Sequence, residues 1–206
     1  MPRFDLVGLG LSAKQRSTGL LLTVIVAAGS GCASLQQLVA LRQVDFSLAG
    51  VVDPRLGGVD LSRIRSYSDL SASDVARLGV AIARKDLPFE FTLNVQGVNP
   101  RDNNVTARMI RMQWTLLLQN KETINGSIDQ PVAFPPGEPV TIPMPMRLNL
   151  FEFFGGTTRD LVDLALAVAG ANPEPVTISL RAVPTIDTPI GPISYPNPIT
   201  IISRTL

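Results

Sequence analysis

Apolar and polar side chains alternate strictly along residues 89–98, and this run is the clearest strand predicted in the chain. One face of the run carries four apolar side chains, Phe89, Phe91, Leu93 and Val95. Comparable runs, separated by turn signals, predict seven or eight strands in all. The other expected strands are residues 44–48, 59–64, 107–119, 124–128, 140–148, 176–182 and 199–202.

Proline and glycine add detail to this pattern. Pro143 and Pro145 cannot donate to a β-ladder, so the strand at residues 140–148 is expected at a sheet edge. Gly126 indicates a bulge or a close approach of another part of the chain. Turns are expected over residues 50–58, at Asp53-Pro54 and Gly57-Gly58, with a hairpin tip at residues 120–122.

Two segments change to a helical period. After the possible N-caps in residues 71–74, apolar side chains recur at three- and four-residue spacing as far as residues 84–85. A second helix is predicted from Thr157 or Thr158 to Ala169, with Gly170 just after its end. Strands at this spacing with two short helical inserts predict an all-β fold, an antiparallel β-sandwich.

Composition narrows the function classes. The chain of 206 residues has a formal net charge of +1 and contains no histidine, so no charge pattern favours nucleic acid and no histidine-based catalysis or metal ligation is available. A single cysteine excludes a thiolate zinc site within the chain. The carboxylates are scattered without catalytic spacing. We therefore expect no enzyme activity, no cofactor and no bound metal.

Two smaller clusters can be interpreted either as structural features or as binding sites. Asp102-Asn103-Asn104 offers oxygens that could bind calcium, but a solvated turn is favoured. Residues 151–154 include three phenylalanines, and packing against the core is favoured over an exposed binding patch.

Cys32 carries the clearest candidate chemistry. No charged residue lies between Arg16 and Arg42, and the apolar run at residues 19–28 is followed by small residues and then Cys32. A basic lead, a short apolar segment and a small-residue exit are typical of a secretory signal peptide. A cysteine directly after the exit resembles the lipobox of bacterial lipoproteins, although Gly29 stands where that motif usually has leucine. The resemblance implies cleavage before Cys32 and acylation of its thiol, including palmitate.

This interpretation predicts the organisation of the chain. Residues 1–31 would be the signal peptide, residues 32–43 a tether, and residues 44–206 one folded domain. An uncleaved membrane anchor and a buried helix with a stray thiol are the alternatives, but the apolar run is about half as long as a membrane span requires. Ala33 differs from the aspartate that often retains lipoproteins in the inner membrane, which favours the outer membrane, facing the periplasm.

The middle of the chain resembles the type 2 late-embryogenesis-abundant (LEA type 2) family, also called the water-stress and hypersensitive-response domain. The similar features are Leu87-Pro88 before a long strand that ends in Asn99-Pro100, Gly126 in the returning strand, and a Pro-Gly turn before residues 140–150. Residues 187–193 are similar to the family's closing loop. The resemblance covers about residues 44–202 and implies a fibronectin-III-like or immunoglobulin-like sandwich with a desiccation or stress role and no catalytic residues.

The expected function is therefore a lipid-anchored envelope protein with a protective or interaction role in stress. Its expected partners are the membrane, through the anchor at Cys32, and a protein or lipid surface, but not nucleic acid. The sequence leaves the oligomeric state open. The alternative is a periplasmic carrier of a lipid or small apolar ligand, which would need a continuous apolar cavity.

Overall fold

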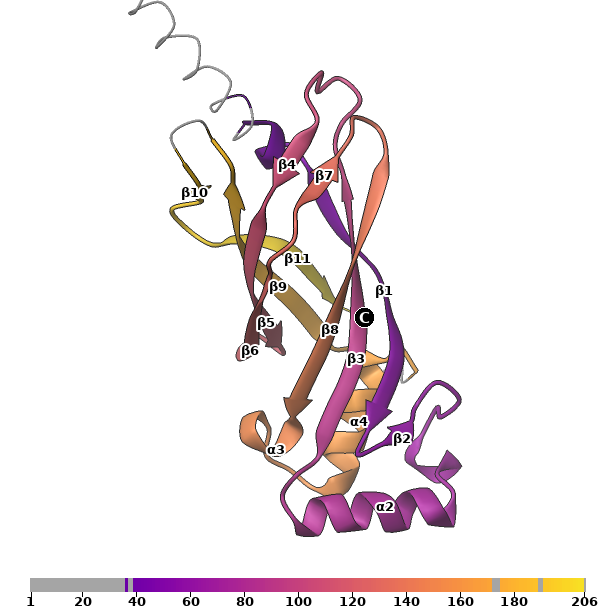
Figure 1. The fold of residues 1–206 in the computed structure, drawn as a ribbon. Helices are drawn as coiled ribbons and strands as arrows, with labels where there is room; N and C mark the ends of the chain where they lie inside the picture. Colours follow the sequence, from indigo (N-terminus) through magenta and orange to yellow (C-terminus); the bar gives the residue numbers. More distant parts are fainter. Residues whose placement is uncertain (1–35, 37–38, 172–174, 189–190, 206) are drawn as a thin grey trace, which may run out of the picture.

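The computed structural model describes residue 36 and residues 39–171, 175–188 and 191–205. In this part of the chain, eleven strands form two larger sheets and a two-stranded ribbon, and every pair of strands is antiparallel. The predicted all-β, antiparallel sandwich is confirmed, but the described residues form eleven strands where seven or eight were expected. The molecule is elongated along the strands of one sheet (Figure 1).

That sheet, called the long sheet below, has the strand order β2-β1-β3-β8. Three of its strands run along most of the molecule, and the fourth pairs only with the end of β1 (Figure 1). Their bounds are β1 (Asp45–Leu56), β2 (Val59–Asp60), β3 (Pro88–Val98) and β8 (Pro139–Asn149). β8 lies at the edge, which confirms the position predicted from Pro143 and Pro145.

The second sheet, called the short sheet, has the order β10-β9-β5-β6, and β11 also pairs with β9. Its strands are β5 (Arg111–Leu118), β6 (Lys121–Ile128), β9 (Thr177–Ile186), β10 (Ile193–Ser194) and β11 (Ile199–Thr205). The ribbon consists of β4 (Ala107–Met109) and β7 (Val132–Phe134). It lies at the end of the molecule where the described chain begins (Figure 1).

Both predicted helices are present. They are α2 (Ala72–Ala83) and α4 (Thr158–Val168), and each begins with a reciprocal capping box. The structure adds a 3₁₀ turn, η1 (Tyr67–Asp69), and a single turn, α3 (Leu150–Phe153). α3 contains two of the predicted phenylalanines, and all three of them are partly buried against the core, as expected.

The two long helices differ in how much they bury. α4 buries six residues and lies along the sandwich beside β1, whereas α2 buries only Leu78 and crosses the end of the long sheet farthest from the ribbon (Figure 1). Both helices are amphipathic in sequence. Their pattern therefore predicted helix formation correctly but not the extent of burial.

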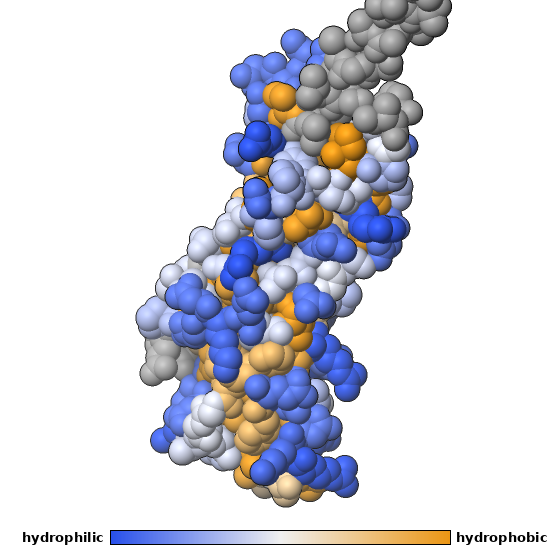
Figure 2. All heavy atoms as spheres, turned by 90° about the vertical axis from the view of Figure 1, so that its left-hand side faces the viewer, coloured by the Kyte–Doolittle hydropathy of each residue, from blue (hydrophilic) through white to orange (hydrophobic). Residues whose placement is uncertain are grey.

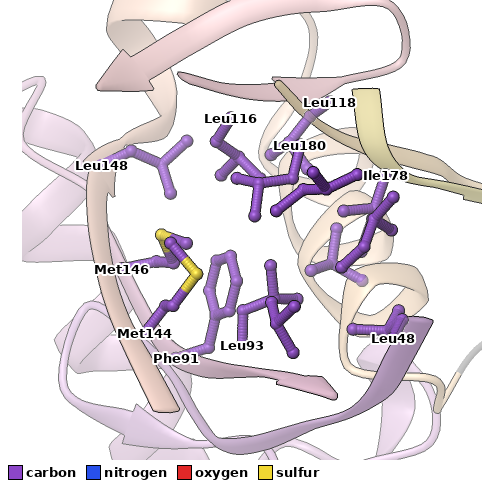
Figure 3. Close-up of a cluster of buried hydrophobic side chains, with 14 of the residues drawn as sticks. Leu48, Phe91, Leu93, Leu116, Leu118, Met144, Met146, Leu148, Ile178 and Leu180 are labelled. Atoms are coloured by element: carbon purple, nitrogen blue, oxygen red, sulfur yellow. The ribbon is translucent and has the colours of Figure 1, made fainter. Parts of the chain in front are cut away.

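The core fills the space between the two sheets. Phe91, Leu93, Met144 and Met146 project from the long sheet toward side chains of the short sheet, and all four are buried (Figure 3). The facing side chains are Leu116, Leu118, Ile178 and Leu180. The alternating face predicted for residues 89–98 is thus the inner face of β3, as expected.

One predicted turn is wrong. β1 continues through Asp53 and Pro54, where the pairing register with β3 shifts between Val52 and Arg55 and Asp53 adopts a φ of 53°. A bulge absorbs the extra backbone, so pairing resumes at Arg55 opposite Glu90. Long-range pairing has overridden a local turn preference.

Other boundaries move less. The predicted strand at residues 59–64 shortens to β2, because Asp60 accepts a hydrogen bond from the Ser62 amide and the chain turns there. The β5–β6 hairpin tip is Gln119-Asn120, both at positive φ, rather than residues 120–122. Gly126 does mark a close approach: a Cβ there would lie 2.4 Å from Cζ2 of Trp114.

Candidate interaction surfaces

The predicted lipidation site, Cys32, and the predicted signal peptide, residues 1–31, lie outside the described residues. Among the helices of the described part, none has the length and hydropathy needed to cross a membrane. After Cys32, the structure describes residue 36 and the chain from Val39 onward. The positions of these residues determine which end of the domain an anchor at Cys32 would hold.

The described part of the predicted tether packs onto the domain through two of its residues, while Val39 is 54% exposed. Ala40 and Leu41 are buried within the core, and Asn103 Nδ2 donates a 3.4 Å hydrogen bond to the carbonyl of Ala40. Cys32 and Ala40 are eight residues apart in the sequence, which corresponds to at most roughly 28 Å of extended chain. The ribbon end of the domain therefore lies within that distance of Cys32.

A buried asparagine organises this end. The Asn99 side chain is fully buried, and its Nδ2 donates to the carbonyls of Val105 and Phe134 at 3.0 and 2.8 Å. Its Oδ1 accepts a 2.7 Å bond from Asn103 Nδ2. Asn99 is thus fully engaged in joining the 99–106 loop to β7, which agrees with the structural role expected of Asn99-Pro100. The side-chain amide of Asn103 donates to Asn99 Oδ1 and to the carbonyl of Ala40, so it also stabilises the turn.

Five ionisable side chains in the described part of the chain have pKa values shifted by their local surroundings. The pKa values of four aspartates are lowered by nearby turn or cap hydrogen bonds, and the pKa of Tyr195 is raised by burial. Within the described residues, no group of three or more Cys, Asp or Glu side chains could hold a metal ion. The shifted aspartates are Asp60, Asp69, Asp74 and Asp160.

Strand register places polar side chains in rows across the outer face of the short sheet. Gln113 lies between Ser127 on β6 and Val183 on β9. In the next row, Thr115 lies between Asn125 and Arg181. All these side chains belong to the face opposite the buried Met112 and Leu116, because the side chains of a strand alternate between its two faces.

An open hollow of about 510 Å³ covers these two rows, and Pro198 contributes to its lining. Two ion pairs lie beside it on the sheet: Arg181 Nη2 to Glu122 Oε1 at 2.7 Å, and Arg111 Nε to Asp129 Oδ1 at 2.8 Å. The middle of the hollow is lined by amide and hydroxyl groups. This surface was not identified from the sequence, because it depends on pairing β5 with β9, whose paired residues Thr115 and Arg181 are far apart in the chain.

Two further hollows have different linings. On the outer face of the long sheet, an open hollow of about 490 Å³ is lined by charged side chains, including Asp53, Arg55 and the Glu90–Arg147 ion pair. At the ribbon, one of about 440 Å³ lies between β4, β7 and Asp187. All three open to solvent, and the space between the sheets is filled by the core (Figure 3).

Apolar side chains are also exposed in places. Val75 and Val80 of α2 are 41% and 52% exposed, and a Cβ added to Gly79, which lies between them, would meet no atom within 4 Å. Figure 2 shows further apolar surface among hydrophilic side chains in the lower half of the face on which α3 lies. These surfaces belong to the half of the molecule farthest from the ribbon.

No protein-family model and no curated protein sequence matches the chain. Solved structures similar to the chain include the following two. One is a protein from Archaeoglobus fulgidus, with 16% identity, 58% of this chain and 84% of that chain covered, and a TM-score of 0.32. The other is a protein provisionally assigned as late embryogenesis abundant (LEA), with 14% identity, 97% and 95% coverage, and a TM-score of 0.34. At these TM-scores neither similarity carries weight for function.

Proposed function

We propose that this chain is a lipid-anchored, non-catalytic protein of the bacterial envelope, held by acylated Cys32, with a protective or interaction role during water stress. The observation that carries the proposal is the sequence around Cys32, where a basic lead, a short apolar run and small residues precede the sole cysteine. The resemblance of residues 44–202 to the LEA type 2 family supports the stress role.

The described structure is compatible with anchoring at this position. Because Ala40 and Leu41 are buried, the chain after Cys32 joins the domain at the ribbon end and leaves a short lead. A force applied at Cys32 would be carried by core contacts and by the Asn103–Ala40 hydrogen bond. The opposite end, with α2, would project away from the membrane.

The interaction role is preferred to that of an apolar-ligand carrier. A carrier needs an enclosed apolar space, and the position between the two sheets is occupied by side chains such as Phe91, Met144 and Leu116 (Figure 3). The open hollows on the outer faces suit contact with a surface or a large ligand instead. We place the protein on the outer membrane, facing the periplasm, because Ala33 follows Cys32.

The stress role is tested by survival after drying. A deletion strain carrying the wild-type gene is expected to survive drying better than the deletion strain, and a strain carrying Cys32→Ser is expected to resemble the deletion strain. Cys32→Ala serves as a second thiol-free variant. Equal survival of the wild-type and deletion strains would overturn the stress role, and full rescue by Cys32→Ser would overturn the requirement for an anchor.

A further inference from the structure

The polar side chains at the centre of the short sheet's outer face present their hydrogen-bonding groups to solvent. The side chains of Gln113, Thr115 and Asn125 make no hydrogen bond or ion pair with any other residue in the described part of the chain. All three line the 510 Å³ hollow. Between them they present two amides and a hydroxyl, each able to donate and to accept.

The charges around these groups are already compensated. Arg181 lines the hollow and pairs with Glu122, while Asp129 pairs with Arg111 and also accepts a hydrogen bond from Ser127. An anionic ligand would have to compete with Glu122 for Arg181. A cationic ligand would have to displace an arginine from a carboxylate. The lining therefore favours a ligand that is polar and uncharged.

We propose that this hollow binds an uncharged saccharide. Sugar hydroxyls donate and accept hydrogen bonds as amides and hydroxyls do, and Gln113, Thr115 and Asn125 lie on neighbouring strands about 4.8 Å apart. The paired strands hold these positions fixed, and Val183 and Pro198 add apolar surface at one side. The assignment deepens the proposed function and rests on it, since it names what the anchored domain would bind.

The outer face of the long sheet provides an internal comparison. Asn94 and Gln96 of β3 lie on that face, and they too make no side-chain hydrogen bond within the described residues. Neither lines the hollow on that face, whose lining includes the Glu90–Arg147 ion pair. The same amide chemistry is therefore present on both sheets, but on the short sheet it lies in a hollow whose charged lining residue, Arg181, is paired with Glu122.

The test is to titrate saccharides into the ¹⁵N-labelled full-length chain, in a detergent without a sugar headgroup. NMR monitors the side-chain amides during the titration. Maltotetraose represents a polymer, maltose a free sugar and tetragalacturonate an anionic saccharide. We expect maltotetraose to shift the Gln113 and Asn125 resonances with a dissociation constant of about 1 mM, while Asn94 and Gln96 stay unchanged. Tighter binding of maltotetraose than of maltose would indicate a polymeric ligand, and equal binding a free sugar.

Variants locate the site. The pair Gln113→Ala and Asn125→Ala is expected to weaken binding at least tenfold, and the matched pair Gln96→Ala and Asn94→Ala to leave it unchanged. The proposal is overturned by absence of shifts with both neutral sugars up to about 20 mM, by equal shifts on the two sheets, or by preference for tetragalacturonate. Acylation of Cys32 is measured separately by mass, so failure of sugar binding is distinguishable from failure of the anchor.

Discussion

The two ends of the long sheet are closed in different ways. At the ribbon end, Phe134 and Asn99 are fully buried, and the chain that follows Cys32 is packed into the same core. At the other end, α2 is attached through Leu78 while its two valines face solvent. The end nearest the proposed anchor is thus tightly cross-connected. At the far end, α2 packs against the rest of the domain on one side only.

Similar local sequences lie in different environments at the two helices. α2 and α4 have the same capping box and nearly the same length, and their N-caps are Ser71 and Thr157. The difference lies in what the rest of the fold places against them. Capping therefore determines where a helix begins, and tertiary contacts determine how firmly it is held.

The largest expected effect is at the ribbon end. Phe134 packs edge-on against Phe46, with ring centroids 5.6 Å apart, and fills the space beside Gly97. Phe134→Ala is expected to lower the free energy of unfolding by about 4 kcal/mol. Urea denaturation measures this, with the half-buried Phe151→Ala as the control. A loss below about 1 kcal/mol would show that this end is not tightly packed.

The buried amide at the same end comes next. Asn99→Leu keeps the branched shape of the side chain but leaves the carbonyls of Val105 and Phe134 without their donor. We expect a loss of about 3 kcal/mol in the free energy of unfolding, since buried groups without partners are costly. Asn94→Leu on the outer face of the long sheet is the matched control and should cost far less. Equal losses would contradict the role assigned to Asn99.

A smaller and more local effect is expected at the far end. Leu78 is 2% exposed, and its Cδ2 lies 3.2 Å from the position of a Cβ on Gly57. Leu78→Ala should cost about 2 kcal/mol and release α2, which hydrogen exchange of the α2 amides would detect. Val80→Ala should change stability by less than about 0.5 kcal/mol. Unchanged exchange in α2 would show that other contacts hold the helix.

Gly79 offers a substitution with the opposite sign. It lies inside α2 with open space around it, so Gly79→Ala should stabilise the protein by about 0.5–1 kcal/mol through helix propensity. Gly97→Ala should destabilise it, because the new Cβ would lie 2.5 Å from Cε1 of Phe134. Thermal denaturation distinguishes the two. Destabilisation by Gly79→Ala would mean that another surface packs against α2 at this position.

The smallest expected effect is the loss of stability of α2 at low pH. A hydrogen bond from the Ser71 side chain is the main cause that lowers the pKa of Asp74, so the ionised carboxylate stabilises the start of α2. Because the folded-state pKa lies below the unfolded value, this stabilisation is complete above about pH 4 and is lost as the pH falls through the folded-state pKa. Asp160 caps α4 in the same way.

We expect α2 to lose helical Cα chemical shifts as the pH falls below about 4, while α4, held by six buried residues, retains them. Asp74→Asn should remove the pH dependence of α2. Simultaneous loss of both helices would show that they are equally well anchored.

Much of the fold was predictable because it depends on local periodicity. The strict alternation at β3 identified its buried face, and Ser71, Thr157 and Gly170 marked helix ends through short-range hydrogen bonds and backbone conformation. The prolines of β8 indicated an edge because they lack amide donors. Each of these signals is contained within a few neighbouring residues.

The remaining features depend on which strands pair. Asp53-Pro54 has the composition of a turn, but pairing of β1 with β3 draws it into a bulged strand. Asn99 was recognised as structural, whereas its partners Val105 and Phe134 follow from the position of β7. The hollow on the short sheet requires three strands in register. No local pattern specifies these contacts.

Attachment through Cys32 can be tested by intact-mass spectrometry of the chain extracted from membranes. We expect a mature protein that begins at Cys32 and carries the additional mass of its acyl chains, and loss of that species in Cys32→Ser. A chain with an intact Met1 end, or with unmodified Cys32 in the soluble fraction, would contradict it.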